Sequence, residues 1–457
     1  MNEPINPSQE APLTRRSFLR TTSTALAGGT LLGALPVERF ALGASPGDTI
    51  KVAVVGCGGR GTGAADQALV AGGDGVKIVA VADAFQNAAE RAVQILKKNH
   101  EHRVDVKPDN IFFGLDAYKE AIALADMVIL ATPPGFRPIH FEEAVKQGKN
   151  IFMEKPVAVD GPGVRRVLEA AKEAKKKNLK VAVGLQRRHQ PNYMQCVQRL
   201  HDGAIGDITS MRVYWDNDGP VGPKAKRAEM AKRLGRQPTE MEYQIANWYM
   251  FAWTCGDHIV EQHIHNLDVA NWVLDGYPVR CWGVGGRSYL NGASDSGEIY
   301  DHFNIEYEYA GGVRVFSQCR QIPGFRWNPV SEFAVGTKGS CDVSGMTILG
   351  PNKWHYKAAD DQEKKMNAGH QAEHYPLQEA IRNDKDYNEA ERGAYSTLTA
   401  IMGRMSAYSG KEVSWQDALN SKLVLAPDQF TWDATPKVLP GPDGKYPYAI
   451  PGKTVAL

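Results

Sequence analysis

Residues 50–61 have the sequence IKVAVVGCGGRG, in which a run of apolar residues is followed directly by a glycine-rich turn. The apolar run is typical of a buried parallel strand, and residues 62–70 continue with a helical pattern. The three glycines of a GxGxxG motif permit a tight bend, close approach to a pyrophosphate, and close packing of helix on strand. The N-terminus of the helix also attracts anions. We therefore predict a dinucleotide-binding loop made of Gly56, Gly58, Gly59, Arg60 and Gly61.

A second strand pattern, residues 76–82, ends on Asp83. Its spacing from the glycine loop, about 20 residues, is that of the acid that binds the adenosine ribose in dinucleotide-binding folds. A carboxylate there would repel a 2′-phosphate, and no Arg or Lys stands in the next few positions to offset the repulsion. The sequence therefore favours NAD over NADP. The alternative role for Asp83 is that of a helix N-cap.

Strand and helix patterns alternate as far as residue 184, which predicts an α/β fold with a doubly wound parallel sheet. The third long strand, 127–130, ends on Ala-Thr-Pro-Pro-Gly, and its end is expected to face the cofactor. The predicted strands are 50–55, 76–82, 111–113, 127–130, 151–153 and 180–183, and the predicted helices are 62–70, 87–98, 117–124, 138–147 and 163–177.

Residues 150–160, NIFMEKPVAVD, place charged side chains at the end of another buried strand. The apolar run stops at Glu154 and Lys155, and Pro156 cannot continue the hydrogen-bond ladder. Open α/β sheets bind ligands at the carboxyl edge of their strands, so these charges are expected beside the dinucleotide. The alternative is a strand end with two solvated charges. A cis bond before Pro156 would fix the turn.

After residue 184 the pattern changes to strands separated by turns, which predicts an α+β domain with an open, mostly antiparallel sheet. We divide the chain into 1–44, a signal peptide; 45–184, the NAD-binding domain; 185–426, a substrate-binding and oligomerisation domain; and 427–457, a proline-rich tail expected to wrap the surface. The strands of the second domain are predicted at 210–215, 280–287, 302–309, 313–320, 331–336 and 340–348, with a hairpin turn at 311–312, and its helices at 191–200, 257–274, 371–383 and 390–408.

Residues 257–274 contain the densest polar cluster of the chain. As one continuous helix they would place Glu261, His265 and Asp268 on one stripe. A carboxylate one turn from an imidazole fixes its tautomer and raises its basicity, as a general base for a hydroxyl proton requires. A metal site of His258, His263 and His265 is the less favoured alternative, because positions 263 and 265 diverge on a helix. The remaining alternative is a helix with a capped, solvated polar face.

Composition excludes several classes of protein. Lys and Arg total 53 and Asp and Glu total 52, so no net field favours nucleic acid or an anionic membrane. No apolar segment is suited to a stable membrane span. The six cysteines include no CxxC pair, which argues against a zinc or redox motif, and free thiols are expected. The aromatic run 247–253 could line a sugar pocket, although such runs are more often core.

The N-terminus carries a targeting pattern. Residues 14–20, TRRSFLR, form a twin-arginine motif, and a weakly apolar run rich in glycine and alanine follows at 25–35. We predict a signal peptide cleaved after Ala44 and export to the periplasm by the twin-arginine route. The alternative is a disordered basic tail. That route carries folded proteins, so a cofactor acquired before export is compatible with it.

The sequence resembles the Gfo/Idh/MocA oxidoreductases, which include glucose–fructose oxidoreductase and inositol 2-dehydrogenase. The resemblance rests on VAVVGCGGRG, ATPPGFRPIH, Met153-Glu154-Lys155-Pro156 and the helix with Glu261, His265 and Asp268, and it spans nearly all of the chain after the signal peptide. It implies a Rossmann domain followed by an open sheet whose face forms homodimers or homotetramers. The residues carried over are, for catalysis, Lys155, His265 and Glu261, and, around the cofactor, Thr132, Pro133, Pro134, His140, Glu154 and Lys155.

The chemistry implied by the resemblance is hydride transfer between a sugar or polyol and tightly bound NAD. His265 would take the hydroxyl proton, and Lys155 would hydrogen-bond the same oxygen and stabilise developing alkoxide charge. The family more often has Asp at the position of Glu261, and His263 is a possible substitute in the substrate site. The substrate-side residues expected are Arg188, Tyr193, Trp253, His263 and Asp268.

Two other functions are compatible with the sequence. One branch of the family consists of exported glycosidases that oxidise transiently with NAD and then eliminate; it has Gly where this chain has His265. Retention of His265 therefore favours a dehydrogenase, although free NAD is scarce in the periplasm, so the cofactor would be recycled in place. A sugar-binding protein on an inactive scaffold is the second alternative, and the pair Lys155 and His265 argues against it.

Overall fold

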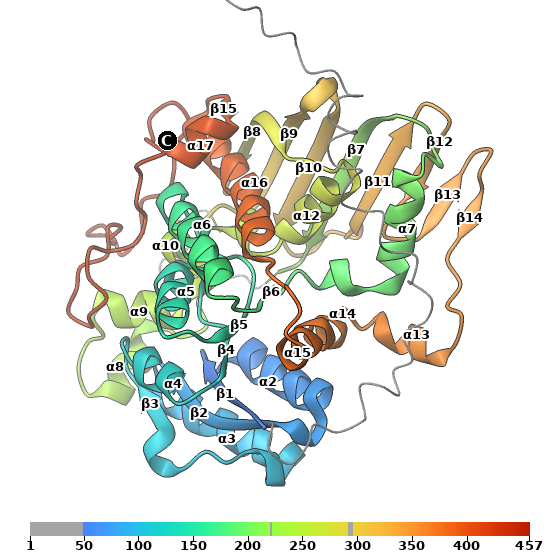
Figure 1. The fold of residues 1–457 in the computed structure, drawn as a ribbon. Coiled ribbons are helices and arrows are strands. Elements are labelled where there is room, and N and C mark those ends of the chain that lie inside the picture. Colours follow the sequence, from blue (N-terminus) through green and yellow to red (C-terminus); the bar gives the residue numbers. More distant parts are fainter. Residues whose placement is uncertain (1–48, 220–221, 291–295) are drawn as a thin grey trace, which may run out of the picture. The chain divides into compact units, whose positions relative to one another are not determined.

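The computed structural model describes residues 49–219, 222–290 and 296–457. These residues form two β-sheets with their covering helices (Figure 1). The predicted twin-arginine motif and the cleavage site after Ala44 lie outside the described residues. Within the described residues, no helix is both long and apolar enough to cross a membrane.

The first sheet confirms the predicted doubly wound fold. Its six strands pair in parallel in the order β3-β2-β1-β4-β5-β6. The strands are β1 (Ile50–Val55), β2 (Val76–Asp83), β3 (Ile111–Phe113), β4 (Met127–Leu130), β5 (Asn150–Met153) and β6 (Val181–Val183). Since the chain order reverses between β1 and β4, the ends of these two strands flank the switch point where such sheets bind ligands.

Helices cover both faces of this sheet, because successive side chains of each strand point to opposite sides. Val52 and Val54 of β1 belong to the core beneath α2 and α3, whereas Ala53 and Val55 belong to the core beneath α4, α5 and α6. The helices are α2 (Gly59–Gly72), α3 (Gln86–His100), α4 (Tyr118–Ala123), α5 (Arg137–Lys146) and α6 (Gly161–Lys176).

Two helices from late in the chain also pack on the Rossmann sheet. The segment predicted as one helix, 371–383, is split into α14 (Gly369–Ala372) and α15 (His374–Arg382). Gln371 donates to the carbonyl of Gln67 at 3.1 Å, and Arg382 donates to the carbonyl of Gly75 at 3.0 Å. The segment therefore leaves the second sheet and packs against α2, as Figure 1 shows.

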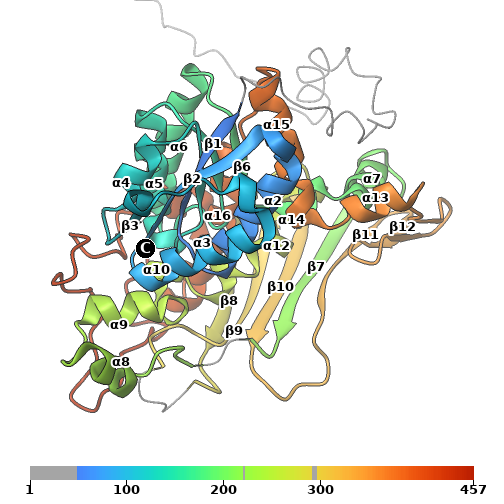
Figure 2. The same cartoon turned by 90° about the horizontal axis from the view of Figure 1, so that it is seen from below.

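The second sheet is mixed and mostly antiparallel, as predicted. Its nine strands run in the order β14-β13-β12-β11-β7-β10-β9-β8-β15, and only β7 and β10 pair in parallel. Figure 2 shows its central strands β8, β9, β10, β7 and β11 in sequence across the sheet. The strands are β7 (Ile208–Asn217), β8 (Pro278–Gly286), β9 (His302–Tyr309), β10 (Arg314–Gln321), β11 (Val330–Gly336), β12 (Gly339–Asp342), β13 (Thr347–Leu349), β14 (Trp354–His355) and β15 (Val413–Ser414).

Two detailed predictions about this sheet can be compared with the structure, a hairpin turn and a long strand. The predicted hairpin turn at 311–312 joins antiparallel β9 and β10 and is confirmed. The single strand predicted over 340–348 is wrong, because β12 and β13 form a hairpin there through Met346, whose φ is 49°. The apolar alternation changes phase here, from Cys341 and Val343 to Met346 and Ile348, and Ser344-Gly345 between them is a turn signal that the prediction passed over.

Helices cover one face of the second sheet. These are α12 (Ile264–Val273) and α16 (Ala390–Ser409), the second close to its predicted range of 390–408. A further helix, α7 (Pro191–His201), was predicted at 191–200 and packs against α12. The opposite face of the central strands presents a row of aligned residues that crosses the sheet: Trp282, Glu306, Phe316, Arg212 and Phe333.

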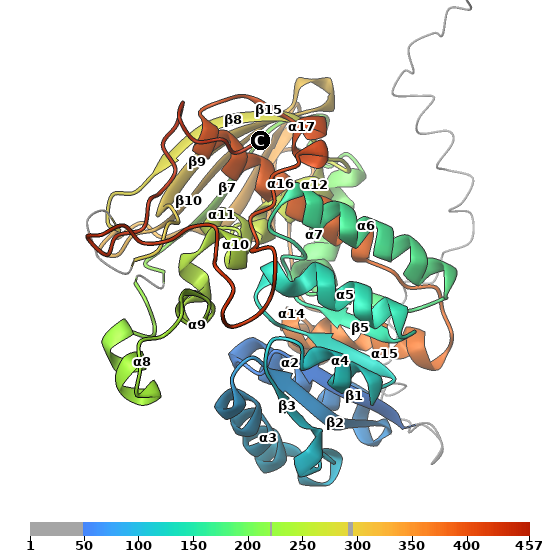
Figure 3. The same ribbon diagram turned by 90° about the vertical axis from the view of Figure 1, so that its left-hand side faces the viewer.

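A third core joins the segment after β7 to the C-terminal tail. The segment after β7 forms α8 (Arg227–Leu234), α9 (Glu240–Ala246), the 3-10 turn η7 (Trp248–Met250) and α10 (Ala252–Cys255). After α17 (Trp415–Asn420) the tail has no helix or strand among the described residues. Figure 3 shows the tail, in red, running past α9 and α10 before it returns toward the nine-stranded sheet. Met230 of α8 and Met241 of α9 therefore share a core with Phe430 and Tyr446 of the tail.

Candidate functional site

A cavity of about 730 Å³ lies where the carboxyl ends of the Rossmann strands meet the second domain. Its walls combine the glycine loop, the residues after β2, β4 and β5, and side chains from the second sheet and its neighbouring helices. The predicted residues that line it are Gly56, Gly58, Gly59, Arg60, Gly61, Asp83, Thr132, Pro133, Pro134, His140, Glu154, Lys155, Glu261 and His265.

The glycine loop is shaped to admit a phosphate. Gly56 has φ 94°, and a Cβ there would lie 2.5 Å from the backbone nitrogen of Thr132. A Cβ on Gly61 would lie 1.8 Å from the carbonyl oxygen of Gly56, so only glycine lets α2 begin this close to β1. Gly58 and Gly59 have open space at the same position and face the cavity. The residues present therefore fit a dinucleotide pyrophosphate at the N-terminus of α2.

Asp83 holds the glycine loop from the end of β2. Its carboxylate accepts hydrogen bonds from the backbone N–H of Cys57 at 2.7 Å and of Phe85 at 2.9 Å. Burial raises the pKa of Asp83, and these hydrogen bonds oppose the increase. The carboxylate lines the cavity at the position expected for an adenosine ribose. The preference for NAD over NADP stays a prediction.

The residues after β4 form a hydrogen-bonded corner around a buried arginine. His140 shares a hydrogen bond with the Thr132 hydroxyl through Nδ1, at 3.0 Å, and burial lowers the pKa of this histidine to about 3. Arg137 is buried and donates to the carbonyls of Glu154, at 3.0 Å, and Thr132, at 2.6 Å. Arg137 therefore ties the ends of β4 and β5 together. Arg137 is not among the predicted site residues, although it is a cation that follows soon after the end of β4.

Glu154 forms an ion pair across the cavity with Arg60 of the glycine loop, with 2.6 Å between Arg60 Nε and Glu154 Oε1. Gly184 leaves room for this carboxylate, since a Cβ there would lie 2.7 Å from Glu154 Oε2. The pair connects the start of α2 to the end of β5. Both residues line the cavity.

Lys155 reaches across the cavity to the second domain. Its ammonium group donates to the backbone carbonyl of Glu261 and lies 3.3 Å from Glu261 Oε1. Both side chains are about nine-tenths buried. The Lys155–Pro156 bond is cis. The strand end predicted at residues 154–156 therefore presents its lysine inside the cavity rather than to solvent.

The predicted continuous helix over 257–274 is wrong. The segment forms α11 (His258–Glu261) and α12, which begins at Ile264, with Gln262 at φ −109° between them. This break turns Glu261 away from the stripe that it was expected to share with His265, and its carboxylate meets Lys155 instead. Polar and aromatic contacts across the cavity determine the local backbone more strongly than helix periodicity does.

His265 remains in the cavity without its predicted carboxylate. Its ring stacks on Trp215 of β7, with 5.6 Å between centroids and 23° between planes. Burial, and next the nearby charge of Lys155, lowers the pKa of His265 well below its ordinary range. Burial raises the pKa of Glu261, and Lys155 opposes that increase. The imidazole is therefore neutral near pH 7, as a general base must be.

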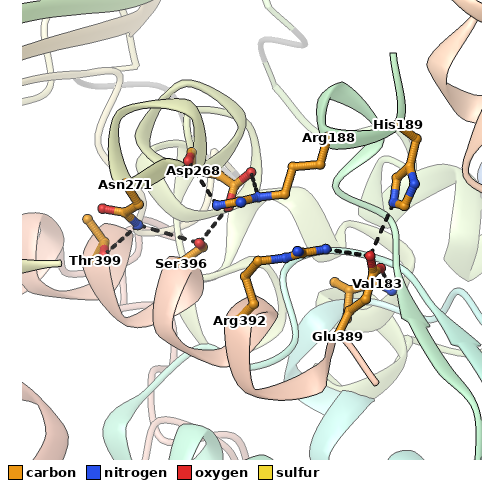
Figure 4. A network of polar contacts seen from close by, with 9 residues as sticks. All are labelled: Val183, Arg188, His189, Asp268, Asn271, Glu389, Arg392, Ser396 and Thr399. Carbon is orange, nitrogen blue, oxygen red and sulfur yellow. Dashed lines mark hydrogen bonds and ion pairs between the residues drawn. The ribbon is translucent and has the colours of Figure 1, made fainter. Parts of the chain in front are cut away.

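Four predicted substrate-side residues make polar contacts elsewhere, and none of them lines the cavity. Arg188 forms a bidentate pair with Asp268, which also accepts from Ser396 at 2.7 Å (Figure 4). Tyr193 donates to Glu332 at 3.2 Å, and His263 bonds the Ser317 hydroxyl at 2.8 Å. All four side chains belong to buried networks that join the second domain internally, so the geometry does not support their predicted contact with substrate.

Trp253 is the fifth predicted substrate residue that lies outside the cavity. It is 2% exposed, packs against Phe136 and Phe430, and donates from Nε1 to Gln244 at 2.7 Å. Two other members of the aromatic run 247–253, Trp248 and Tyr249, line the cavity instead. The sequence does not distinguish the core members of this run from its cavity members.

The cavity also contains residues that the sequence analysis did not select: Gln186, Trp215, Lys224, Gln262 and His370. Gln186 follows the carboxyl end of β6, where open α/β sheets bind ligands, so the sequence already indicated it as a candidate site residue. His370 comes from α14, and only the chain's return to α2 brings it to the site. No group of three or more possible metal ligands occurs in the described part of the chain.

Comparison with known sequences matches both domains. Residues 50–185 match the Gfo/Idh/MocA description "Oxidoreductase family, NAD-binding Rossmann fold", and residues 193–342 match "GFO/IDH/MocA C-terminal domain". An inositol 2-dehydrogenase of Rhizobium meliloti is 26% identical over 60% of this chain and 69% of its own length. One from Serratia proteamaculans is 32% identical over 44% of this chain and 48% of its own length.

Comparison with solved structures matches most of the chain, across both sheets. Scyllo-inositol dehydrogenase of Lactobacillus casei, solved with NAD(H) and scyllo-inositol, superimposes with a TM-score of 0.57 and 20% identity over 80% of this chain and 99% of that one. Myo-inositol 2-dehydrogenase of Lactobacillus plantarum gives 0.58 and 21% over 80% and 99%. At these identities the likeness concerns the fold alone.

Proposed function

We propose, since this chain belongs to the Gfo/Idh/MocA family of oxidoreductases, that it transfers a hydride between NAD and a secondary alcohol of a sugar or polyol. The observation that carries the proposal is the meeting of Lys155 and His265 in one cavity with the glycine loop. These two side chains come from different domains, and a binding loop for a dinucleotide alone would not require either of them. Relatives named inositol 2-dehydrogenases support a polyol as the substrate class.

The residues divide the proton chemistry between them. NAD, when bound, supplies the hydride acceptor. His265, neutral because burial lowers its pKa, takes the proton from the substrate hydroxyl. Lys155 donates a hydrogen bond to the same oxygen and stabilises its developing negative charge. Glu261 holds the Lys155 ammonium from the other side, at 3.3 Å, and so positions it.

The cofactor we propose is NAD, held by the glycine loop, Asp83 and the corner around Thr132. The Asp83 carboxylate at the ribose position disfavours a 2′-phosphate, which supports NAD over NADP. Measuring binding of NADH and NADPH to the purified protein by nicotinamide fluorescence tests this preference. Tighter binding of NADPH would reject it.

The activity is tested with a panel of sugars and cyclic polyols, including inositols. The purified protein is incubated with each, with and without added NAD, and the absorbance of reduced nicotinamide is followed. We expect reduction with at least one panel member and none with the Lys155→Ala and His265→Ala variants. Turnover that survives both substitutions would refute the assigned site.

The same panel, extended with glycosides, tests the alternative of a glycosidase that oxidises transiently. Glycoside cleavage without net accumulation of reduced nicotinamide would favour this alternative over the dehydrogenase. The presence of His265, where that branch of the family has Gly, is the reason to rank the dehydrogenase first.

Assembly and location complete the proposal. The uncovered face of the nine-stranded sheet carries exposed apolar side chains, among them Val284 and Phe316, which supports a homodimer or homotetramer that buries this face.

The twin-arginine motif at 14–20 supports export to the periplasm. Cell fractionation of the wild type and of the Arg15→Lys, Arg16→Lys variant tests export, and we expect only the wild type in the periplasmic fraction.

A further inference from the structure

The C-terminal tail contacts the cofactor side of the cavity wall through two aromatic rings. Phe430 packs on Phe136 with 5.1 Å between ring centroids, and Trp432 packs on Phe85 with 5.7 Å. Phe85 and Phe136 are themselves part of the cavity wall. Phe430 also lines a smaller neighbouring hollow together with Leu115, which borders both spaces.

The two wall residues that the tail contacts follow the carboxyl ends of β2 and β4. Phe85 follows Asp83 by two positions, and its backbone N–H donates to the Asp83 carboxylate at 2.9 Å. Phe136 belongs to the 3-10 turn η5 (Pro134–Phe136), directly after the cavity residues Pro133 and Pro134. Both loops would have to move if a bound dinucleotide were to leave past them.

Hydrogen bonds fix the tail on either side of the two rings. The backbone N–H of Leu425 donates to Asp160 at 2.9 Å, which anchors the tail to the N-cap of α6. The Thr239 hydroxyl donates to the carbonyl of Trp432 at 2.7 Å, and Gln244 donates to the carbonyl of Val438 at 2.8 Å. Residues 425–438 therefore connect the Rossmann domain to α9.

Further along, Tyr446 repeats the attachment to the same helix. Its hydroxyl donates to Glu240 at 2.8 Å, and its ring, 5% exposed, packs on Phe251 with 4.9 Å between centroids. α9 in turn contributes Ile245 and Ala246 to the cavity wall. The tail thus holds two separate parts of this wall, the loops after β2 and β4 on one side and α9 on the other (Figure 3).

We propose that Phe430 and Trp432 of the tail are cofactor-retention residues that slow release of the bound dinucleotide. Opening the wall past Phe85 and Phe136 separates them from the two tail rings and exposes apolar surface to water, which raises the barrier to release. The cofactor can enter while the tail is still unpacked and is then held. The inference rests on the proposed function only in requiring that a nicotinamide dinucleotide binds in this cavity.

The test measures release without turnover. Full-length protein loaded with NADH is mixed with excess NAD, and the decay of bound-nicotinamide fluorescence gives the dissociation rate. For the Phe430→Ala, Trp432→Ala double variant we expect dissociation about tenfold faster or more, with an association rate that is not slower. Leu439→Ala, which removes a 43% exposed side chain of the same tail, is the matched control and should release NADH at the wild-type rate.

The outcomes separate the inference from the proposed function. A double variant that is folded by circular dichroism and releases NADH at the wild-type rate overturns the inference, while the binding seen in the same experiment leaves the cofactor assignment intact. A wild type that binds no NADH overturns both. If the double variant does not fold, Trp432→Phe replaces it, and faster release is again required because the smaller ring packs less closely on Phe85.

Discussion

At the scale of single residues, the partner of Glu261 is the main result. The sequence pairs this carboxylate with His265, one helical turn away, but its Oε1 lies 3.3 Å from the Lys155 ammonium. In the proposed mechanism the acid therefore positions Lys155 and does not orient His265. His265 is left with an aromatic partner, Trp215, and a neutral ring.

A neutral substitution at Glu261 tests this positioning role. Glu261→Gln keeps the shape of the side chain but removes the charge that holds Lys155, so we expect kcat to fall about tenfold, equivalent to about 1.4 kcal/mol, with little change in KM. Steady-state kinetics on the best substrate of the panel provide the measurement. Glu298→Gln is the control, since this carboxylate accepts from the backbone of Ala252 and does not line the cavity. An unchanged kcat in Glu261→Gln would contradict the role.

The lowered pKa of His265 predicts the pH profile. A general base works when it is deprotonated, so lowering its pKa moves the acid limb of kcat/KM to lower pH. We expect this limb below the ordinary histidine range, that is, below about pH 6.5. Lys155→Met removes a nearby positive charge that contributes to the shift, so the pKa of His265 itself, followed by NMR of the imidazole, should move upward in this variant. An acid limb at or above the ordinary range in the wild type would argue against His265 as the base.

At the scale of elements, some glycines of the loop before α2 are required for packing and others for ligand binding. Gly61 sits where a Cβ would meet the Gly56 carbonyl oxygen at 1.8 Å, so its requirement for glycine comes from helix–strand packing. Gly58 and Gly59 meet nothing within 4 Å and open onto the cavity. The same motif thus contains a residue needed by the fold and residues needed by the ligand.

Alanine substitutions should affect either protein stability or cofactor binding, depending on the glycine that is replaced. Gly61→Ala forces α2 away from β1, and we expect it to lower the free energy of unfolding by at least about 2 kcal/mol. Gly58→Ala should change that free energy by only about 0.5 kcal/mol, because nothing opposes its methyl group, but should weaken NADH binding. Denaturant unfolding and NADH titration measure the two effects. Equal loss of stability in both variants would contradict the distinction.

At the scale of the whole molecule, the described chain is organised by segments that cross between its two sheets. α14 and α15 return to α2 between strands β14 and β15 of the second sheet, and the tail reaches the loops after β2 and β4. The cavity is consequently walled by both domains, and the last part of the chain packs against the wall residues Phe85 and Phe136.

The uncovered face of the second sheet predicts the assembly. Val284 is 68% and Phe316 46% exposed on this face, and we expect the Val284→Glu, Phe316→Glu variant to lose the oligomer because charges would be buried in its interface. Sedimentation velocity at matched concentration measures the mass. Val455→Glu, a change at a 78% exposed tail residue, is the control. A monomeric wild type, or a variant that keeps the wild-type mass, would refute the interface.

Much of this organisation follows from local signals. Buried strands, the glycine loop, Asp83 and the charges at the end of β5 are encoded within short windows, because strand periodicity and turn chemistry act over a few residues. These signals predict the Rossmann fold and the dinucleotide loop, whereas the meeting of Lys155 and His265 was predicted only through the family resemblance. They do not reveal breaks such as the one at Gln262, where a contact between domains outweighs helix propensity.

The sequence by itself thus determines the fold class and the cofactor loop, since both depend on neighbouring residues. Only the tertiary structure decides which polar side chains meet. Four of the predicted substrate residues form hydrogen bonds in buried networks and so lie outside the cavity. Arg188 pairs with Asp268, Tyr193 with Glu332, and Trp253 with Gln244. The pairing of Lys155 with Glu261 and the contact of Trp432 with Phe85 join residues far apart in the chain. Burial makes such pairs energetically necessary, but their identity depends on how the whole chain packs.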